Sequence, residues 1–321
     1  MGITRQQALD CFASDDLIGI GMEADALRRT LHPEGVVTYT IDRVLPCSNP
    51  DLETSYASAR ESVALGVTGL HLPPVPRQPV PLDHFESLFR GIKQRFPQVQ
   101  LHGLSATEVV ALAAAENLSL RDTLARLQDA GLDCLAGTAV ILNDEIRKRA
   151  VPDKCTAAEW INVHRTAHQL DLPTKATMVF GVGETIADRI DHLEILRALQ
   201  DETGGFTAFT PLAAQPGDVR IPPNVAEPTA VEYLTTLAVS RLYLDNIPNL
   251  QGSWATQGLK VLQMGLRFGG NDVGAVLLEE PIGKPGWKPG GATEEELRRI
   301  IREAGFKPVQ RDTLYRTLFL N

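Results

Sequence analysis

The sequence predicts an α/β protein, a (βα)8 TIM-type barrel of parallel strands with an N-terminal helical extension. Eight short runs rich in β-branched and other apolar residues recur along the 321-residue chain. The segments between them repeat apolar residues every three to four positions, which is the pattern of amphipathic helices. No Pro/Gly/Ser-rich stretch is long enough to separate two domains. Eight successive strand–helix units are the number that closes a barrel.

The strands follow one another at regular intervals. The predicted strands are VVTYTI (36–41), TGLHL (68–72), VQLHG (99–103), DCLAG (133–137), KATMVF (175–180), GFTAF (205–209), NLQGS (249–253) and GAVLL (274–278). Predicted helices include residues 50–66, 83–96, 157–171, 185–201 and 229–247. Ser105 followed by Glu108 forms a capping box, and Gly66 and Gly131 end the helices before them. We therefore expect a helical extension over residues 1–35 and a barrel with a C-terminal helical segment over 36–321.

Composition and charge exclude several classes of function. Hydrophobic residues make up 43% of the chain and charged residues 22%, as in ordinary soluble proteins. The net charge is −9 and the 31 basic residues form no run, which argues against a nucleic-acid partner. Four scattered cysteines indicate reduced thiols, and no apolar stretch approaches a membrane span or a signal peptide. These features predict a cytoplasmic protein with a small-molecule ligand and no membrane partner.

The functional face of such a barrel is formed by the loops after the carboxyl ends of the strands. FGVGET (180–185) follows the fifth strand, where Gly181 and Gly183 let the backbone approach a ligand. Glu184 lies near the start of the next helix, where it could accept from a ribose hydroxyl or an amino group. An equally weighted alternative is a tight strand-to-helix turn with an acidic cap. GxG alone does not have the spacing of a dinucleotide fingerprint.

Two histidines end neighbouring strands. His71 closes the second strand and His102 the third, so their side chains are expected to meet above the barrel. Together with Glu184 they are the candidate catalytic residues, acting as acids or bases. A metal site is the alternative, but no acidic third ligand is evident and we expect no metal. His164 and His168 lie four apart on an outer helix and are expected on its solvated face.

Other polar residues at the strand ends are candidate ligand contacts. QGSWATQG (251–258) is a polar, aromatic loop that suits a flat, hydrogen-bonding ligand such as a nucleobase or an aromatic acid. The candidate ligand-binding residues are Tyr39, Asp42, Arg43, Ser105, Gly181, Gly183, Gln215, Gln251, Ser253 and Trp254. Cys47 follows the first strand, but no base or orienting group near it in the sequence supports a nucleophilic role.

Several separated motifs resemble one enzyme family. They are HPEGVVTYTIDR (32–43), LHGLSATEV (101–109), TMVFGVGET (177–185), ETGGFTAFTPLAAQPG (202–217), YLTTLAVSRLYLDNIPNLQGSWATQGLKV (233–261), GGNDVGAVLLEE (269–280) and VQRDTLYR (309–316). Across essentially the whole chain the sequence is similar to radical SAM enzymes of the futalosine route to menaquinone, especially dehypoxanthine futalosine cyclases. Relatives of those enzymes make aminofutalosine and the deazaflavin core of coenzyme F420. The resemblance also implies a (βα)-type barrel.

One part of the family pattern is missing. The resemblance implies a C-x3-C-x2-C loop after the first strand, whose three thiolates hold a [4Fe–4S] cluster that cleaves S-adenosylmethionine. Here that loop reads VLPCSNP (44–50), and Cys47 is its one cysteine. The Gly-Gly turn that the family has after its second strand reads LPPVPRQP (72–79), in which proline removes backbone donors. We therefore expect no [4Fe–4S] cluster and no other cofactor; binding of S-adenosylmethionine or a nucleoside stays open.

Three functional hypotheses follow from this pattern. The first is a cluster-free homologue that binds a futalosine-like nucleoside or a related aromatic metabolite, without radical cleavage of S-adenosylmethionine. The second is a pseudoenzyme that binds an intact radical SAM paralogue as its protein partner. The third is a menaquinone-pathway cyclase, as overall similarity suggests. Whether the chain is an enzyme is thus left open by the sequence, although the missing cysteines argue against radical SAM activity.

Overall fold

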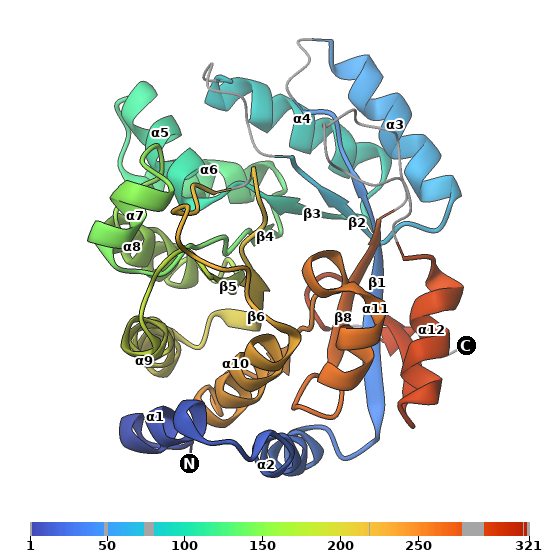
Figure 1. The fold of residues 1–321 in the computed structure, drawn as a ribbon. Helices are drawn as coiled ribbons and strands as arrows, with labels where there is room; N and C mark the ends of the chain where they lie inside the picture. Colours follow the sequence, from blue (N-terminus) through green and yellow to red (C-terminus); the bar gives the residue numbers. More distant parts are fainter. Residues whose placement is uncertain are drawn as a thin grey trace.

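The structure is a computed structural model that describes residues 2–47, 51–73, 80–217, 219–277, 292–316 and 318–319. Its centre is a ring of parallel strands (Figure 1). The eight strands are β1 (Val36–Val44), β2 (Gly69–His71), β3 (Gln100–Gly103), β4 (Cys134–Leu135), β5 (Thr174–Phe180), β6 (Phe206–Ala213), β7 (Asn249–Leu250) and β8 (Asp272–Leu277). They pair in chain order from β1 to β7, and β8 pairs with β1. A bridge between Gln251 and Asp272 nearly closes the ring, so the predicted barrel is confirmed.

Helices surround this ring. They are α1 (Arg5–Ala13), α2 (Leu17–Leu31), α3 (Leu52–Ala64), α4 (Leu82–Arg95), α5 (Ala106–Ala115), α6 (Leu120–Ala130), α7 (Asp144–Ala150), α8 (Ala157–His168), α9 (Ile186–Thr203), α10 (Ala230–Tyr243), α11 (Trp254–Gly265) and α12 (Glu294–Glu303). The predicted capping box at α5 forms, with the Glu108 carboxylate accepting from the backbone and hydroxyl of Ser105. Among the described residues, no helix is long and apolar enough to span a membrane.

The N-terminal helices α1 and α2 dock on the outer ring. Both pack against α10, and α1 also contacts α9 (Figure 1). The Ile3 amide donates to the carbonyl of Leu242 at 3.0 Å, and His32 Nε2 donates to the carbonyl of Pro248 at 2.9 Å. This second bond ties the end of α2 to the residue before β7. The chain thus enters β1 from the end of the barrel where the strands begin.

The C-terminal region contains two strands in addition to a helix. After α12 come β9 (Lys307–Arg311) and β10 (Leu318–Phe319). Strand β9 pairs in parallel with the first half of β1, and β10 pairs antiparallel with β9. The sequence KPVQR mixes charged residues with a proline, so no strand pattern is visible in it. Its pairing places Arg311 inside the barrel.

Alternation along β1 sorts its side chains onto two faces. Thr38 and Asp42 take part in contacts with residues of other strands inside the ring, Asp272 and His102 respectively. Tyr39, between them, points the opposite way toward α12. Successive residues of a strand point to opposite faces, so neighbours in the sequence cannot line the same interior. This rule decides which of the predicted residues reach the centre of the barrel.

Candidate active site

Three side chains from three neighbouring strands form a row inside the barrel. Nε2 of His102 on β3 lies 3.2 Å from Oδ2 of Asp42 on β1, at ion-pair distance but outside ideal hydrogen-bond geometry. Nδ1 of His71 on β2 lies 3.4 Å from Nδ1 of His102. The Thr40 hydroxyl donates to the other oxygen of Asp42 at 3.0 Å. The structure therefore joins the two predicted histidines to Asp42, which we had assigned to ligand binding.

Burial and charge set the protonation of this row. Burial alone would raise the pKa of Asp42, but the charge and contact of His102 outweigh it and lower that pKa to about 2. Burial, and then the neighbouring His102, lower the pKa of His71 to about 3. Burial lowers the pKa of His102 as well, against the opposing effect of Asp42. At neutral pH the row is one carboxylate followed by two neutral imidazoles.

The row has one accessible member. Asp42 and His102 are buried, with 2% and 8% of their surface exposed, whereas His71 is half-buried. A carboxylate can only accept, so the proton of His102 belongs on Nε2, facing Asp42. Nδ1 of His102 then accepts from Nδ1–H of His71. The second nitrogen of His71 is left as a base, oriented by two groups behind it.

A buried ion pair lies beside this row. Arg311 of β9 donates to both oxygens of Asp272 of β8, at 2.5 and 2.9 Å, and neither side chain has any exposed surface. The Thr38 hydroxyl donates to the same carboxylate. Burial opposes the charge on Arg311, but Asp272 more than offsets it and raises the arginine pKa. Sequence reasoning missed this pair, because Arg311 lies in a strand without a strand-like pattern.

Two predicted ligand residues face the helices instead of the barrel interior. The Tyr39 hydroxyl donates to Glu294 at 2.6 Å and accepts from Arg298 at 2.7 Å, both on α12. Arg43 donates to Glu61 of α3 at 2.8 Å. The structure does not bring them to Asp42, although all three lie within one five-residue stretch. Strand alternation is the physical reason.

The FGVGET loop is a turn held together by its own glutamate. Glu184 accepts from the backbone amides of Gly181 and Val182, at 2.7 and 2.8 Å, and from Nε of Arg189 at 2.8 Å. Its side chain is 1% exposed, so it is not the exposed acceptor that we expected. Gly181 and Gly183 both have φ of 86°, a left-handed conformation that favours glycine. The geometry matches the alternative of a structural turn.

Most of the remaining residues predicted to bind a ligand form hydrogen bonds that hold the backbone of their loops in place. The Ser105 hydroxyl donates within its capping box, and the Ser253 hydroxyl accepts from the Thr256 amide at the start of α11. Gln215 donates to the carbonyls of residues 213 and 214. Gln251 takes part in the bridge that joins the β7 end to β8. Trp254 Nε1 donates to the carbonyl of Ala275 at 3.2 Å, which anchors the start of α11 on β8.

His164 and His168 are not on a solvated face, which corrects our expectation. They are 0% and 7% exposed and face the barrel wall. Both share the hydroxyl of Thr174 on β5, at 3.0 Å from Nδ1 of His164 and 2.8 Å from Nε2 of His168. An outer helix has one face toward the barrel, and residues four apart share a face. These two lie on the inner face.

The cysteines are spread over the fold. Cys11 lies in α1, Cys47 in the loop after β1, Cys134 in β4 and Cys155 before α8. Cys47 is 1% exposed, and burial, followed by the charge of Glu108, raises its thiol pKa to about 11. Residues 48–50 and 74–79, which include parts of two loops that depart from the family pattern, lie outside the described residues. Within the described ranges, no three histidine, cysteine or acidic side chains gather to hold a metal ion.

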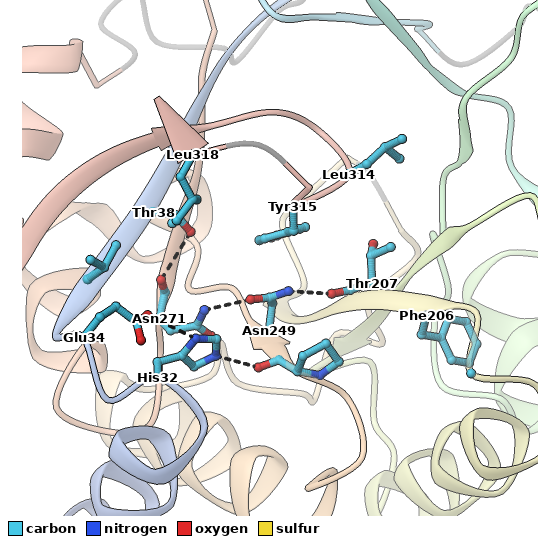
Figure 2. A pocket seen from close by; sticks show the side chains of 13 residues that line it. His32, Glu34, Thr38, Phe206, Thr207, Asn249, Asn271, Leu314, Tyr315 and Leu318 are labelled. Atoms are coloured by element: carbon cyan, nitrogen blue, oxygen red, sulfur yellow. Dashed lines mark hydrogen bonds and ion pairs between the residues drawn. The ribbon is translucent and has the colours of Figure 1, made fainter. Parts of the chain in front are cut away.

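A cavity lies at the opposite end of the barrel, where the strands begin. Its volume is about 460 Å³ and Figure 2 shows the residues that line it. They are His32, Glu34, Val36, Thr38, Gly204, Phe206, Thr207, Pro248, Asn249, Asn271, Leu314, Tyr315 and Leu318. A chain of amide hydrogen bonds crosses it, from Asn271 to Asn249 and on to the carbonyl of Thr207. None of the candidate site residues lines this cavity.

Comparison with known proteins identifies a matching family model and two similar full-length relatives. The family model for the CofH/MqnC C-terminal region matches residues 203–320. An aminodeoxyfutalosine synthase from Thermus thermophilus is 38% identical over 305 residues, covering 92% of this chain and 78% of that protein. A cyclic dehypoxanthine futalosine synthase from Streptomyces coelicolor is 33% identical over 345 residues, covering 99% of this chain and 86% of that protein.

Solved structures agree on the fold. Methylornithine synthase superposes with a TM-score of 0.72 at 15% identity, over 96% of this chain and 94% of that one. The FeFe-hydrogenase maturase HydG from Carboxydothermus hydrogenoformans gives a TM-score of 0.75 at 14% identity, over 98% of this chain and 78% of that one. At such identities the likeness concerns the fold alone. The two synthases described above share enough sequence with this chain to show that it belongs to the futalosine-pathway radical SAM family.

Proposed function

We propose that this protein is a cluster-free member of its family that binds a futalosine-like nucleoside or a related aromatic metabolite inside the barrel. The row of Asp42, His102 and His71 is the observation that carries the proposal. It supplies a base with a fixed orientation and needs no electron donor. The names of the relatives, which describe synthases of futalosine derivatives, support the ligand class.

The side chains around Cys47 do not fit a [4Fe–4S] cluster. Cluster ligands are thiolates, and a family-type site takes three of them from one short loop. The described part of the loop after β1 supplies Cys47 alone, buried and with a raised pKa. The other three cysteines belong to α1, β4 and the segment before α8. No step of the proposed chemistry therefore passes through a cluster or through cleavage of S-adenosylmethionine.

The row can move a proton at a defined atom. Because burial lowers the pKa of His71 to about 3, this weak base accepts a proton only from an acidic group of the ligand. Nε2 of neutral His71 takes that proton, and the imidazolium that forms keeps Nδ1–H directed at His102. His102 in turn keeps its Nε2–H toward the Asp42 carboxylate, which stabilises the positive charge. Reversal of the step returns the proton to the ligand. A proton abstraction or an acid–base isomerisation is the class of reaction this arrangement supports.

Titration calorimetry with dehypoxanthine futalosine, futalosine and S-adenosylmethionine tests the proposal. The wild-type protein is expected to bind one of the two nucleosides. His71→Gln should retain most of that affinity but lose any turnover of the bound nucleoside, because a glutamine cannot accept the proton. His32→Gln, at the far end of the barrel, is the matched control and should behave as wild type. Absence of binding by both nucleosides would contradict the proposal.

A further inference from the structure

Strand β5 presents a lysine to the interior of the barrel. The Thr174 hydroxyl contacts His164 and His168 of α8, and the Phe180 ring lies under Arg189 of α9, so these positions face the helices. By strand alternation Lys175 faces the opposite side. Positions 175, 177 and 179 are each half-buried, whereas 174, 176, 178 and 180 are buried. The inner face of β5 is thus the accessible one.

The charge of Lys175 acts on the proposed site. It lowers the pKa values of Asp42, His71 and His102, as well as that of Cys134. Parallel pairing of His102 with Cys134 and of Leu135 with Thr174 connects β3 through β4 to β5. Lys175 is the residue after Thr174. Its side chain therefore lies inside the same barrel as the histidine row, with β4 between them.

Among the described residues, Lys175 has no counter-ion: no carboxylate forms an ion pair with its ammonium group, and that group makes no hydrogen bond. Arg311, also inside the barrel, is by contrast paired with Asp272 through two hydrogen bonds. A half-buried ammonium group that has lost part of its hydration gains from an anion placed beside it.

We infer that Lys175 binds a carboxylate of the ligand and so positions that ligand against His71. The inference rests on the proposed function and adds the charged group that the ligand must carry. A monoanion fits better than a phosphate dianion, because the buried Asp42 carboxylate repels excess negative charge in the same interior. Lys175 is thereby a binding residue of the site.

The test compares benzoate with its uncharged analogue benzamide, by calorimetry on the full chain. Wild type should bind benzoate at least about tenfold more tightly, the scale of one charge-assisted hydrogen bond. Lys175→Met should remove this preference while leaving benzamide affinity unchanged, which also shows that the variant is folded. Lys175→Arg should keep part of the preference. Lys260→Met, on the exposed side of α11, is the control for loss of one positive charge.

Each outcome has a distinct meaning. If wild type binds benzoate no better than benzamide, or if Lys175→Met keeps the preference, the inference is wrong. Binding of dehypoxanthine futalosine, measured in the same preparation, separates this failure from that of the proposed function. If the nucleoside binds but wild type shows no preference for benzoate, the proposed function stands and Lys175 has no part in it. If Lys175→Met loses a benzoate preference that wild type has, but no nucleoside binds, the anion site stands and the nucleoside is not the ligand.

Discussion

Asp42 on β1 reaches His102 on β3 across the intervening strand β2, with 3.2 Å between Oδ2 and Nε2. The residue of β2 in register with Asp42 is Gly69. A Cβ atom there would lie 2.5 Å from Oδ1 of Asp42 and 2.4 Å from the hydroxyl of Thr313. The absent side chain leaves the space through which the carboxylate passes. The contact between two strands that do not pair therefore depends on one glycine.

Replacing Asp42 by asparagine should lower the pKa of His102 further. Burial already lowers that pKa, and Asp42 is the group that opposes the effect. NMR titration of the ring nitrogens would show the shift directly. Asp83→Asn, on the exposed start of α4, should leave the His102 titration as in wild type. A rise in the pKa of His102 in Asp42→Asn would contradict the electrostatic description of the row.

Breaking the Asp272–Arg311 pair should destabilise the fold strongly. Arg311→Met leaves the Asp272 carboxylate buried without its partner, at a cost of about 3–5 kcal/mol in the free energy of unfolding. Asp272→Asn combined with Arg311→Met should restore part of that loss, because no charge is then left unpaired. Urea denaturation of Arg311→Met, of Asp272→Asn and of the double variant measures both effects. Additive losses in the double variant would show that the two residues do not act as a pair.

Glu184→Gln should lower the free energy of unfolding, and a loss of stability should be its main effect. The carboxylate accepts from two backbone amides and from Arg189 while almost fully buried, so its loss should cost about 2–3 kcal/mol. Thermal unfolding measures the change, and Glu145→Gln at the exposed start of α7 is the control. An unchanged melting temperature together with weaker nucleoside binding would instead make Glu184 a direct ligand contact.

Acid should destabilise the protein through its buried histidines. Burial lowers the pKa of His168 to about 4 and that of His192 to about 3, below the value of about 6.5 in an unfolded chain. The unfolded state therefore takes up protons first, and the free energy of unfolding falls as the pH drops from about 6.5 toward 4. Each histidine contributes a slope of about 1.4 kcal/mol per pH unit.

His168→Gln isolates one of these contributions. Denaturant titrations at pH 6 and pH 5 should show a smaller loss of stability on acidification than in wild type, since one buried imidazole is gone. The variant should be less stable than wild type at pH 7, because His168 bonds to Thr203 and Thr174 there. An unchanged dependence on pH would mean that folding does not lower the pKa of His168.

The strands of the barrel could be predicted from the sequence because each one shows a local pattern of apolar residues. Their order then follows from the rule that successive strand–helix units close a barrel. The β-branched run 36–41 lies in β1, and KATMVF (175–180) lies in β5. Strand β9 could not be found this way, since KPVQR becomes a strand only through pairing with β1. Strand β9 therefore depends on tertiary pairing. So does the role of Arg311, whose partner Asp272 is 39 residues away in the sequence.

The site was predictable in part, for a similar reason. Because His71 and His102 end adjacent strands, the sequence predicts that their side chains meet, although above the barrel and not inside it, where the structure places them. Tyr39 and Arg43 were grouped with Asp42 by proximity in the sequence, whereas alternation along β1 places them on the other face. Glu184 looked available because its partners are backbone amides, which the sequence does not reveal. Lys175 belongs to no recognisable sequence motif. It stands out only in the structure, as a charge inside the barrel with no partner among the described residues.

Iron and sulfide content after anaerobic purification and reconstitution tests the central claim most directly. The cysteines lie in separate elements, with Cys47 alone in the described part of the loop after β1. We therefore expect iron far below one cluster per chain, and no charge-transfer absorption from bound iron and sulfide. About four irons per chain with matching sulfide, the content of a [4Fe–4S] cluster, would contradict it and return the protein to radical chemistry.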